Sequence, residues 1–412
     1  MKVLHVVGGE LTGGAAKGAY NLHCGLKDIG VDSKILTNSN ETFGDSDIIS
    51  VSNSKIGKAV TYFRKKLDFY SPCIYLKRSP REFSTGIWGI DLKKQVCYHN
   101  ADVIHLHWIN GGFINIRDLK KISKPLVWSM RDMWPITGGC HYAINCERYK
   151  VGCGKCPQLK SRLKHDLSWL IIRRKIKYLP IDIKLVGVSR WLSSVAADSY
   201  VFRNYDVTTI NNSVNCKEFF PVDKKTARSV LGIGTEKKIL LAGATDLKSL
   251  YKGFDKYIES LKYLDKKEYL LLFFGEVDNK LIVDLGYEYK CFGYVKDTIT
   301  LRLIYSAADL FVGPSIMDAL PKTLVEAMAC GTPVVCFDAT GPKDIVDHKI
   351  CGYKAVPFEP IDLAKGIKWV SDNRDYEVLC KKAIEKTQKS FENKIAASQY
   401  AELYKNIVRK DC

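Results

Sequence analysis

Short apolar runs alternate with longer amphipathic stretches along most of the chain. An apolar run bounded by turn residues is typical of a buried strand, whereas apolar positions three or four residues apart are typical of a helix that packs on a sheet. The first run, Lys2–Val7, precedes a glycine-rich turn and a helical pattern over residues 15–29. Further strands are predicted at residues 31–36, 103–107, 125–129 and 185–188.

The same pattern starts again after residue 222. Strand–helix alternation buries a parallel sheet between two helix layers, and 412 residues exceed the size at which a single hydrophobic core keeps growing. We therefore predict an α/β fold with two Rossmann-like, doubly wound domains that face each other across a cleft. The second set of strands is expected at residues 238–242, 269–274, 291–292, 310–312 and 333–337, with helices at 255–264 and 298–307. The domains are expected at residues 1–210 and 223–385, joined by a hinge at 211–222, with a C-terminal helix over 386–412 that packs back toward the first domain.

The formal net charge of +18 favours an anionic partner. Nucleic acid is not expected, because the sequence has no helix-turn-helix, RNP-type or zinc-finger pattern with basic residues facing a groove. A membrane surface or a phosphorylated small molecule remains. We find no secretory signal pattern and no apolar run near the roughly 20 residues that span a bilayer, so we expect a cytoplasmic protein.

The most informative stretch lies between the strands expected at 310–312 and 333–337. There Asp318 stands on a loop and Glu326 stands eight residues later, inside the following helix. This spacing gathers two carboxylates and the free amides of a helix N-terminus around one point. Carboxylates accept hydrogen bonds from vicinal hydroxyls and amides bind oxyanions, which is what a sugar nucleotide requires. A capped helix with a second acid on its surface is the simpler alternative.

This acid pair resembles the motif of the family 4 glycosyltransferases, which are retaining enzymes of the GT-B fold. Asp318 and Ala319-Leu320 stand where the family usually has Glu and Phe-Gly. The segments 187–192, 209–215, 219–221, 293–295 and 307–315 resemble other family segments in the same order, including the interdomain hinge. The resemblance implies an N-terminal acceptor domain and a C-terminal domain for a UDP- or GDP-sugar donor.

The resemblance also implies roles for single residues. Glu326 would hold the ribose hydroxyls and Asp318 the transferred sugar. Lys252 matches the lysine of the diphosphate loop, and Lys248 is the candidate for the arginine that usually accompanies it. Two fixed cations would stabilise the leaving diphosphate, so we expect catalysis without a metal cofactor. The full set expected to bind the donor is Gly13, Gly14, Lys248, Lys252, Val295, Asp318, Ala319, Leu320, Pro321 and Glu326.

Family members commonly carry a His before an acid at the end of a strand, facing the transferred sugar. Arg131, before Asp132, occupies that position here. We therefore take Arg131 and His141 as catalytic candidates beside Lys252 and Asp318, with His107 as a second candidate for the histidine role. A structural, hydrogen-bonded histidine at a strand end is an equally good interpretation.

The run of residues 131–135 and the cysteine-rich stretch after it resemble a family 4 subgroup of bacterial capsule and colanic-acid-like polysaccharide pathways. Such pathways build on a lipid diphosphate, which implies a lipid-linked saccharide acceptor and a peripheral position on the inner face of the membrane. Residues 159–179 carry seven basic residues against Asp166, interleaved with Trp169 and aliphatic residues, as in an interfacial amphipathic helix. Residues 55–81 form a second basic and aromatic stretch. Solvated faces of ordinary helices are the alternative for both.

Four cysteines form a cluster of their own, Cys140, Cys146, Cys153 and Cys156. The closing Cys-x-x-Cys has the tight spacing with which two thiolates share one tetrahedral ion. In a reducing compartment such a cluster favours a metal over disulfides, so a structural zinc is expected, with free or paired thiols and an iron–sulfur cluster as alternatives. The other cysteines, such as Cys291, are expected to be small buried hydrophobes.

The function predicted from the sequence is transfer of a sugar, with retention, from a nucleotide-sugar donor to a saccharide acceptor in bacterial surface polysaccharide synthesis. One alternative is a GT-B sugar-nucleotide epimerase or hydrolase, which would use the donor site without an acceptor. Another is an inactive relative that only binds the sugar nucleotide.

Overall fold

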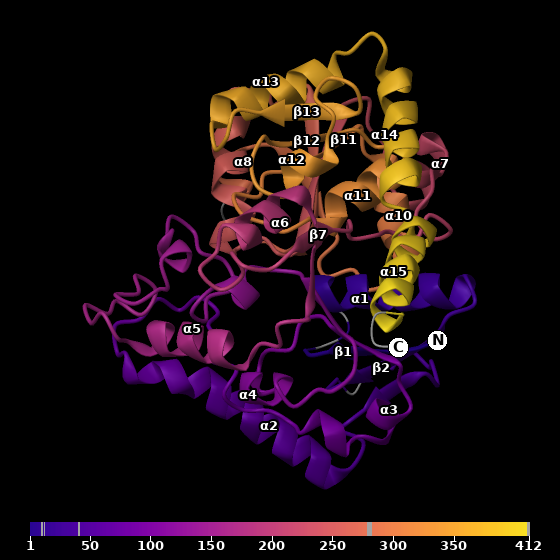
Figure 1. The fold of residues 1–412 in the computed structure, drawn as a ribbon. Coiled ribbons are helices and arrows are strands. Elements are labelled where there is room, and N and C mark those ends of the chain that lie inside the picture. Colours follow the sequence, from indigo (N-terminus) through magenta and orange to yellow (C-terminus); the bar gives the residue numbers. More distant parts are fainter. Residues whose placement is uncertain (10, 12, 40–41, 278–281, 410–412) are drawn as a thin grey trace. The chain divides into compact units, whose positions relative to one another are not determined.

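The structure is a computed structural model that describes residues 1–9, 11, 13–39, 42–277 and 282–409. The chain divides into two compact units (Figure 1). Unit 1 comprises Met1–Asn211 and Ala396–Cys412, and unit 2 comprises Asn212–Ile395. Each unit is an α/β structure around one parallel sheet, so the predicted fold class is confirmed.

Unit 1 holds a seven-stranded sheet in the order β3-β2-β1-β4-β5-β6-β7, in which every pair of neighbours is parallel. Its strands are β1 (Lys2–Val7), β2 (Asp32–Thr37), β3 (Ile48–Ser50), β4 (Val103–Leu106), β5 (Leu126–Met130), β6 (Lys184–Gly187) and β7 (Val207–Thr209). The central strands are apolar and buried along their length, as expected of a sheet covered on both faces.

The helices of unit 1 are α1 (Gly14–Asp28), α2 (Lys55–Tyr70), α3 (Val96–His99), α4 (Ile116–Leu119), α5 (Leu167–Tyr178), α6 (Arg190–Ala197) and the greater part of α15 (Asn393–Val408). The helices α1 and α15 share one core with the sheet: Leu22 and Leu26 of α1 and Tyr404 of α15 pack with valines of β1, β4, β5 and β6. The last helix of the chain therefore completes the core that the first strand begins.

Unit 2 holds a six-stranded parallel sheet in the order β10-β9-β8-β11-β12-β13. Its strands are β8 (Lys238–Asp246), β9 (Tyr269–Glu276), β10 (Glu288–Cys291), β11 (Leu310–Gly313), β12 (Val334–Phe337) and β13 (Gly352–Ala355). Its helices are α7 (Lys224–Val230), α8 (Phe254–Leu261), α10 (Thr298–Ala307), α11 (Lys322–Ala329), α12 (Pro342–Ile345), α13 (Pro360–Ser371) and α14 (Tyr376–Ser390).

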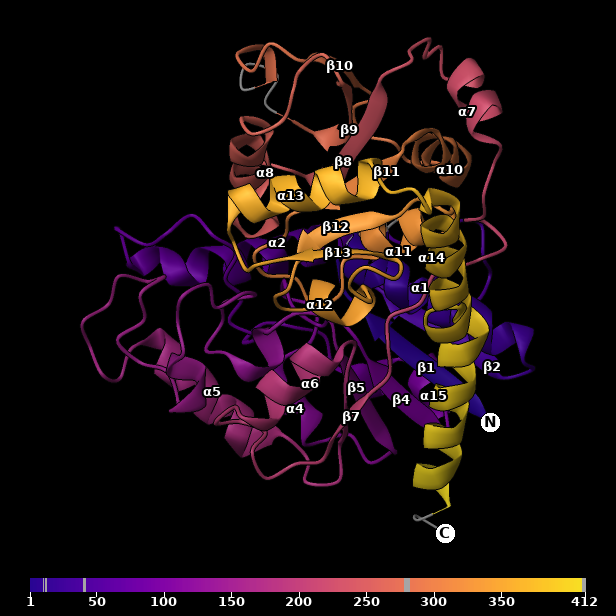
Figure 2. The same ribbon diagram turned by 90° about the horizontal axis from the view of Figure 1, so that it is seen from above.

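The alternation of side chains along β11 gives the two faces of this second sheet different helices. Leu310 and Val312 point into a core with α8 and α13, which lie side by side (Figure 2). Phe311, between them, contacts the ring of Tyr305 in α10 on the opposite face. Unit 2 is thus a three-layer structure with loops gathered at the carboxyl ends of its strands.

Three short strands, β3, β7 and β13, were not predicted from the sequence. The helix predicted over residues 386–412 is interrupted, because α14 ends at Ser390 and α15 begins at Asn393, and residues 410–412 lie outside the described residues. Cys291 is exposed rather than buried, because it ends the edge strand β10. Among the described residues, no helix is long and apolar enough to cross a membrane.

Candidate functional site

The sheet of unit 2 has its topological switch point between β8 and β11. The chain runs from β8 outward to β9 and β10, and then starts again at β11 and runs outward to β12 and β13. The loops that follow β8 and β11 therefore leave in opposite directions and open a crevice at the carboxyl edge, where sheets of this class bind ligands. Lys252 stands on the first of these loops and Asp318 on the second.

The two loops are fixed to each other by backbone contacts. The amides of Ile316 and Met317 both donate to the carbonyl oxygen of Tyr251, at 2.9 and 3.2 Å. Gly253 has φ +63°, and a Cβ there would lie 2.0 Å from the Pro314 carbonyl oxygen, so only glycine fits. The contact between these loops requires the glycine that follows Lys252.

Across this junction the Lys252 Nζ donates to Asp318 Oδ2 at 2.7 Å. Burial tends to lower the pKa of Lys252, but the Asp318 carboxylate, together with Tyr251 and Asp246, outweighs it and raises the pKa above its usual range. The lysine is therefore a fixed cation at neutral pH.

The second acid, Glu326, is buried on α11 and held by hydrogen bonding. The Tyr305 hydroxyl donates to Glu326 Oε2 at 3.0 Å, and Lys322 Nζ lies 3.8 Å from Oε1. Asp318 is buried to the same degree. α11 begins after Pro321, and no described side chain caps its first turn, so its leading amides are available to an anion.

The remaining residues predicted for the donor site in unit 2 stand on the loops that follow β8, β10 and β11. Lys248 is exposed on the loop after β8, where its amide donates to Asp246 Oδ1 at 2.8 Å. Val295 is half-buried in the loop after β10. Ala319 and Leu320 are buried, and a Cβ at Gly341 would lie 2.2 Å from the Ala319 carbonyl oxygen, so a second loop packs closely on them.

In unit 1 the switch point lies between β1 and β4. Gly13 and Gly14 stand after β1, at the start of α1, whose first turn is capped by no described side chain and contains no acid. A Cβ at Gly14 would meet no atom within 4 Å, so packing does not require glycine there. The amides of this turn are accessible beside the switch point of the first sheet.

Arg131, at the end of β5, is buried and bonded to His107. Its Nε donates to His107 Nδ1 at 3.2 Å, while His107 Nε2 lies 2.8 Å from His5 Nδ1. Burial lowers the pKa of Arg131 to about 10, so the guanidinium stays charged at neutral pH. Burial also lowers the pKa of His107 well below 6.5, with His105 and Arg131 adding to the effect. His107 is a neutral acceptor that orients Arg131.

Asp132, the next residue, collects donors on both of its oxygens. His141 Nδ1 lies 2.7 Å from Oδ2, Trp108 Nε1 donates to the same oxygen at 3.0 Å, and the Trp134 amide donates to Oδ1 at 2.9 Å. The second ring nitrogen of His141, Nε2, lies 3.1 Å from Ser84 Oγ. Asp132 is the centre of this cluster, with His141 as its partner.

His141 is buried and both of its ring nitrogens have partners. Burial tends to lower its pKa, but Glu82 and Asp132 outweigh burial and raise the pKa above 6.5. A carboxylate within hydrogen-bond distance stabilises the imidazolium. His141 therefore stays protonated to higher pH than an ordinary histidine and orients Asp132.

Two groups of described side chains have ligand atoms within 4.8 Å of one another: His5, His105 and His107, and His23, Asp45 and Asp47. Both nitrogens of His105 are bonded, to Tyr404 and Ser129, and both nitrogens of His107 are bonded, to His5 and Arg131. In the second group, the Lys27 ammonium forms an ion pair with Asp47 Oδ2 at 2.6 Å. In both groups, side chains that an ion would need are already engaged by partners within the protein, so we assign no metal to either.

The predicted interfacial helix over residues 159–179 is wrong in part, as the structure of α5 shows. Lys175, taken there as a basic residue of an interfacial helix, is fully buried, because its ammonium lies 3.9 Å from the centre of the Trp134 ring and donates to the Thr137 carbonyl at 2.7 Å. Arg174 donates to Asn115 at 3.1 Å. Residues 159–166 precede the helix as loop and turn. Only part of the predicted basic face is turned outward.

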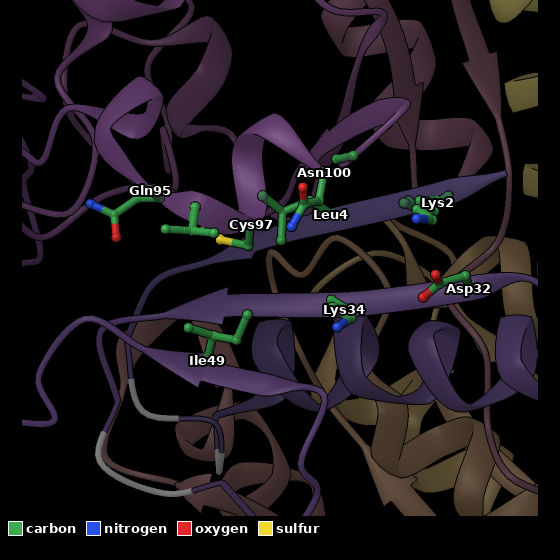
Figure 3. A pocket seen from close by; sticks show the side chains of 11 residues that line it. Lys2, Leu4, Asp32, Lys34, Ile49, Gln95, Cys97 and Asn100 are labelled. Atoms are coloured by element: carbon green, nitrogen blue, oxygen red, sulfur yellow. The ribbon is translucent and has the colours of Figure 1, made fainter.

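A pocket of about 560 Å³ lies at the other end of the first sheet. Figure 3 shows Lys2, Asp32 and Lys34 among the side chains of β1 and β2 that line it, with Cys97 of α3 on its rim. It lies toward the amino ends of these strands, where ligands of doubly wound sheets do not bind, and its charged side chains are exposed. We assign no function to it.

Several groups of the site were missed by sequence reasoning. Tyr305 stands 21 residues before the acid it holds, and Glu82 and Ser84 reach His141 from a segment without regular pattern. A buried tyrosine on a helix carries no chemical pattern of its own. Asp132 carries a recognisable pattern, since it follows a buried strand and precedes Trp-Pro turn residues.

Residues 223–390 match the sequence family described as "Glycosyl transferases group 1". A protein of Escherichia coli (strain K12) described as a colanic acid biosynthesis glycosyl transferase, WcaC, is 25% identical over 272 residues, which are 63% of this chain and 64% of that protein. The N,N'-diacetylbacillosaminyl-diphospho-undecaprenol alpha-1,3-N-acetylgalactosaminyltransferase of Campylobacter jejuni is 24% identical over 201 residues, 48% of this chain and 53% of that protein. The matches thus span less than two thirds of the length of these two relatives.

The fold also resembles that of solved structures, among them a glycosyltransferase from Rickettsia africae ESF-5, which matches with a TM-score of 0.66 at 18% identity over 99% of this chain and 98% of that chain. Anabaena Alr3699/HepE in complex with UDP-glucose matches with a TM-score of 0.67 at 16% identity, over 98% of this chain and 100% of that chain. At this identity the likeness concerns the fold alone. It agrees with the two parallel-sheet units described above, and the GT-B architecture is the one expected from the sequence.

Proposed function

We propose that this chain, which carries a glycosyltransferase group 1 domain, transfers a sugar from a nucleotide-sugar donor to a saccharide acceptor with retention of configuration. The observation that carries the proposal is the set of Lys252, Asp318 and Glu326 at the switch point of unit 2. A cation, two buried carboxylates and an uncapped helix N-terminus there meet the needs of a diphosphate, a ribose and a sugar.

Glu326 is the group for the ribose hydroxyls. Its Oε2 already accepts from Tyr305, so the carboxylate is held in one orientation, with Oε1 toward Lys322. A fixed acceptor binds a diol at a smaller entropic cost than a mobile one. Asp318, on the preceding loop, would accept from hydroxyls of the transferred sugar.

Lys252 is the group for the diphosphate. Its ammonium is held at 2.7 Å from Asp318, and a diphosphate bound at the same loop would lie within reach of the same ammonium. Charge grows on the leaving diphosphate as the glycosidic bond breaks, so a fixed cation lowers the barrier. With Lys248 and the amides of α11 beside it, this site would not need a metal ion, and we expect activity to persist in EDTA.

The acceptor would bind to unit 1, at the carboxyl edge that carries Arg131 and Asp132. The name of the Campylobacter relative describes an acceptor on a diphospho-undecaprenol, and that of the E. coli relative describes colanic acid biosynthesis. These names support a lipid-linked saccharide of bacterial surface polysaccharide synthesis as the acceptor. On this proposal the enzyme meets such an acceptor at the inner face of the cell membrane.

The surface suited to that membrane is α2. Only Asp68 of its 16 residues is buried, and Ile56, Phe63 and Leu67 are 77%, 64% and 44% exposed. Exposed apolar side chains recur along it at intervals of four and three residues: Ile56, Val60, Phe63, Leu67, Tyr70 and, beyond its end, Ile74.

The charge around this apolar stripe is positive. The segment 55–81 contains eight basic residues and one acidic residue. That acidic residue, Asp68, is buried and accepts hydrogen bonds from the amides of Thr85 and Gly86. An exposed apolar stripe flanked by lysines and arginines is complementary to an anionic lipid surface. We therefore place the membrane contact on α2 rather than on α5.

The deciding experiment is a transfer assay with a panel of UDP- and GDP-sugars, each tested with and without polyprenyl-diphosphate saccharides in vesicles. Acceptor-dependent release of the nucleotide diphosphate, abolished by Glu326→Ala, is the expected result. Donor turnover that needs no acceptor would instead identify an epimerase or hydrolase. Donor binding without any turnover would identify a binding protein.

A further inference from the structure

Four cysteines from one long loop of unit 1 line a single cavity. The cavity has a volume of about 20 Å³, which is room for about one water-sized particle. The sulfur-bearing residues that line it are Cys140, Cys146, Cys153 and Cys156. Thr137 and Ser168, which belongs to α5, also line the cavity.

The backbone around the second pair of cysteines, Cys153 and Cys156, includes residues in the left-handed conformation. Cys153 and Lys155 have φ +58° and +45°, a conformation that side-chain-bearing residues rarely adopt and that the surrounding structure must enforce. The amides of Gln158 and Leu159 are directed at the Cys156 sulfur, and the Cys156 amide donates to Asp166 Oδ2 at 2.8 Å. Burial raises the pKa of the Cys156 thiol, and these two amides oppose the rise.

A buried lysine contacts Thr137, one of the residues that line the cavity. Lys175 is fully buried, and its ammonium donates to the Thr137 and Trp134 carbonyls and lies over the Trp134 ring. No described carboxylate forms an ion pair with it within 4.0 Å. Burial lowers the pKa of Lys175 to about 7, so a nearby anion would stabilise its ammonium form.

We propose that Cys140, Cys146, Cys153 and Cys156 bind one structural Zn²⁺ as thiolates, and that the ammonium of Lys175 balances part of the centre's negative charge. Four thiolates leave a net negative charge on the zinc they bind, and Zn²⁺ prefers four such ligands in a tetrahedron. The structure as it stands brings no three of the four sulfurs within 4.8 Å of one another among its described residues. The ion would therefore draw them in by changes of side-chain rotamer around the cavity they already share.

The centre would also fix the neighbourhood of His141, which follows Cys140 directly. Cys140 pairs with Phe83 as an antiparallel bridge, and the Gln158 side chain donates to the carbonyls of Arg81 and Glu82 at 3.0 and 2.9 Å. The cysteine loop thus holds the segment from which Glu82 and Ser84 reach His141. In this arrangement the zinc is a positioning element for the acceptor side and takes no part in bond making.

The first test is the metal content of the full chain purified without chelator. About one zinc per chain is expected, as for a closed structural site, and Co²⁺ exchanged into it should give the visible absorption of tetrahedral thiolate ligation. Less than about 0.2 zinc per chain, with the four thiols titrating freely or oxidised in pairs, would overturn the proposal. This measurement uses the wild-type protein and does not depend on variants that fold.

The second test separates the parts of the centre. Cys153→Ser and Cys156→Ser should lose the zinc, whereas Cys73→Ser, outside the cavity, should keep it. Lys175→Met should retain zinc about tenfold less tightly in competition with a chelator, the usual size of an outer-shell effect. Unchanged zinc affinity in Lys175→Met would remove the lysine from the centre. Donor binding in unit 2 should be unchanged in all four variants, which distinguishes failure of this proposal from failure of the proposed transfer activity.

Discussion

The hydroxyl of Tyr404, eight residues from the end of the chain, lies 2.6 Å from Nδ1 of His105 on strand β4. Tyr400, one turn earlier, places its hydroxyl 2.6 Å from Ser129 Oγ, which in turn lies 2.7 Å from His105 Nε2. All four side chains are buried. The C-terminal helix thus completes a polar network inside unit 1 and, through His105 and His107, supports the position of Arg131.

Removal of the Tyr404 hydroxyl should destabilise unit 1. Tyr404→Phe leaves a buried nitrogen of His105 without its partner, which costs about 1–3 kcal/mol. Six of the seven tryptophans belong to unit 1, so urea unfolding followed by tryptophan fluorescence reports on this unit. The matched control is Tyr263→Phe, because Tyr263 is 46% exposed. Equal midpoints for the two variants would mean that the hydroxyl of Tyr404 contributes nothing to stability.

The histidine network should also make unit 1 sensitive to acid. Burial lowers the pKa of His5, His105 and His107 well below 6.5, so each binds a proton more readily in the unfolded chain. The free energy of unfolding should therefore fall as the pH falls through about 6.5, because unfolding takes up as much as one proton for each of the three imidazoles. His141 acts in the opposite direction, because its pKa is raised.

The slope of unfolding free energy against pH between 7.5 and 5.5 measures this proton uptake. His165 is exposed and lies outside the hydrogen-bonded histidine network, so His165→Gln is the matched control and should keep the wild-type slope. A wild-type slope near zero across this range would show that the three imidazoles are not held neutral.

Donor binding should depend on Glu326 and, less strongly, on the tyrosine that orients it. Glu326→Ala removes a charge-assisted hydrogen bond worth about 1.5–3 kcal/mol, or roughly 10- to 150-fold in affinity. Tyr305→Phe keeps the carboxylate but frees its orientation, so a smaller loss is expected. Calorimetric titration with the donor identified by the panel measures both. Glu359, at the start of α13, supplies the control Glu359→Ala. Wild-type affinity in Glu326→Ala would exclude this acid from the donor site.

Lys252 should matter more for the rate than for donor affinity. The charge that it meets is largest when the bond to the diphosphate is breaking, so Lys252→Ala should lower kcat by about 100-fold or more. Lys256→Ala, in the first turn of α8, is the control, since among the described residues the ion-pair partner of that lysine is Glu259, at 3.8 Å. Single-turnover kinetics with saturating donor separate the two effects. An unchanged single-turnover rate would show that the ammonium does not assist departure of the diphosphate.

The apolar runs of the sequence predicted the central strands of both sheets, because buried parallel strands are continuous apolar runs. Asp318 and Glu326 were singled out by their spacing and Lys252 by the family resemblance, and the structure brings Lys252 and Asp318 within 2.7 Å of each other. Reasoning from local patterns failed where a contact joins distant segments. The pairing of Tyr404 with His105 spans 299 positions, and nothing near either residue points to the other.

Lys175 shows a second limit of the same reasoning. Its helix is amphipathic by composition, but its ammonium is satisfied by two carbonyls and a ring from the loop 134–137, and no local pattern predicts that a lysine will point inward. The short strands β3 and β7 were missed because three residues are too few to show alternation.

The surface of α2 leads to the last prediction, which concerns the membrane. The full chain should bind vesicles that contain anionic lipid, and binding should weaken as salt increases, because each basic residue near the surface contributes about 1 kcal/mol within a Debye length. Ile56→Ser together with Phe63→Ser should release the protein, since both side chains are strongly exposed and their removal leaves the charge unchanged. Vesicle sedimentation at two salt concentrations measures both effects.

The apolar and the basic parts of this surface can be separated. Lys58→Glu together with Lys66→Glu should abolish the preference for anionic over neutral vesicles, whereas Lys365→Glu together with Lys381→Glu in unit 2 should not, because the α2 stripe is untouched. The stripe at intervals of four and three residues would also suit a second copy of the helix. If the serine variant binds vesicles like the wild type but changes from dimer to monomer in solution, α2 is a dimer interface and the membrane assignment is wrong.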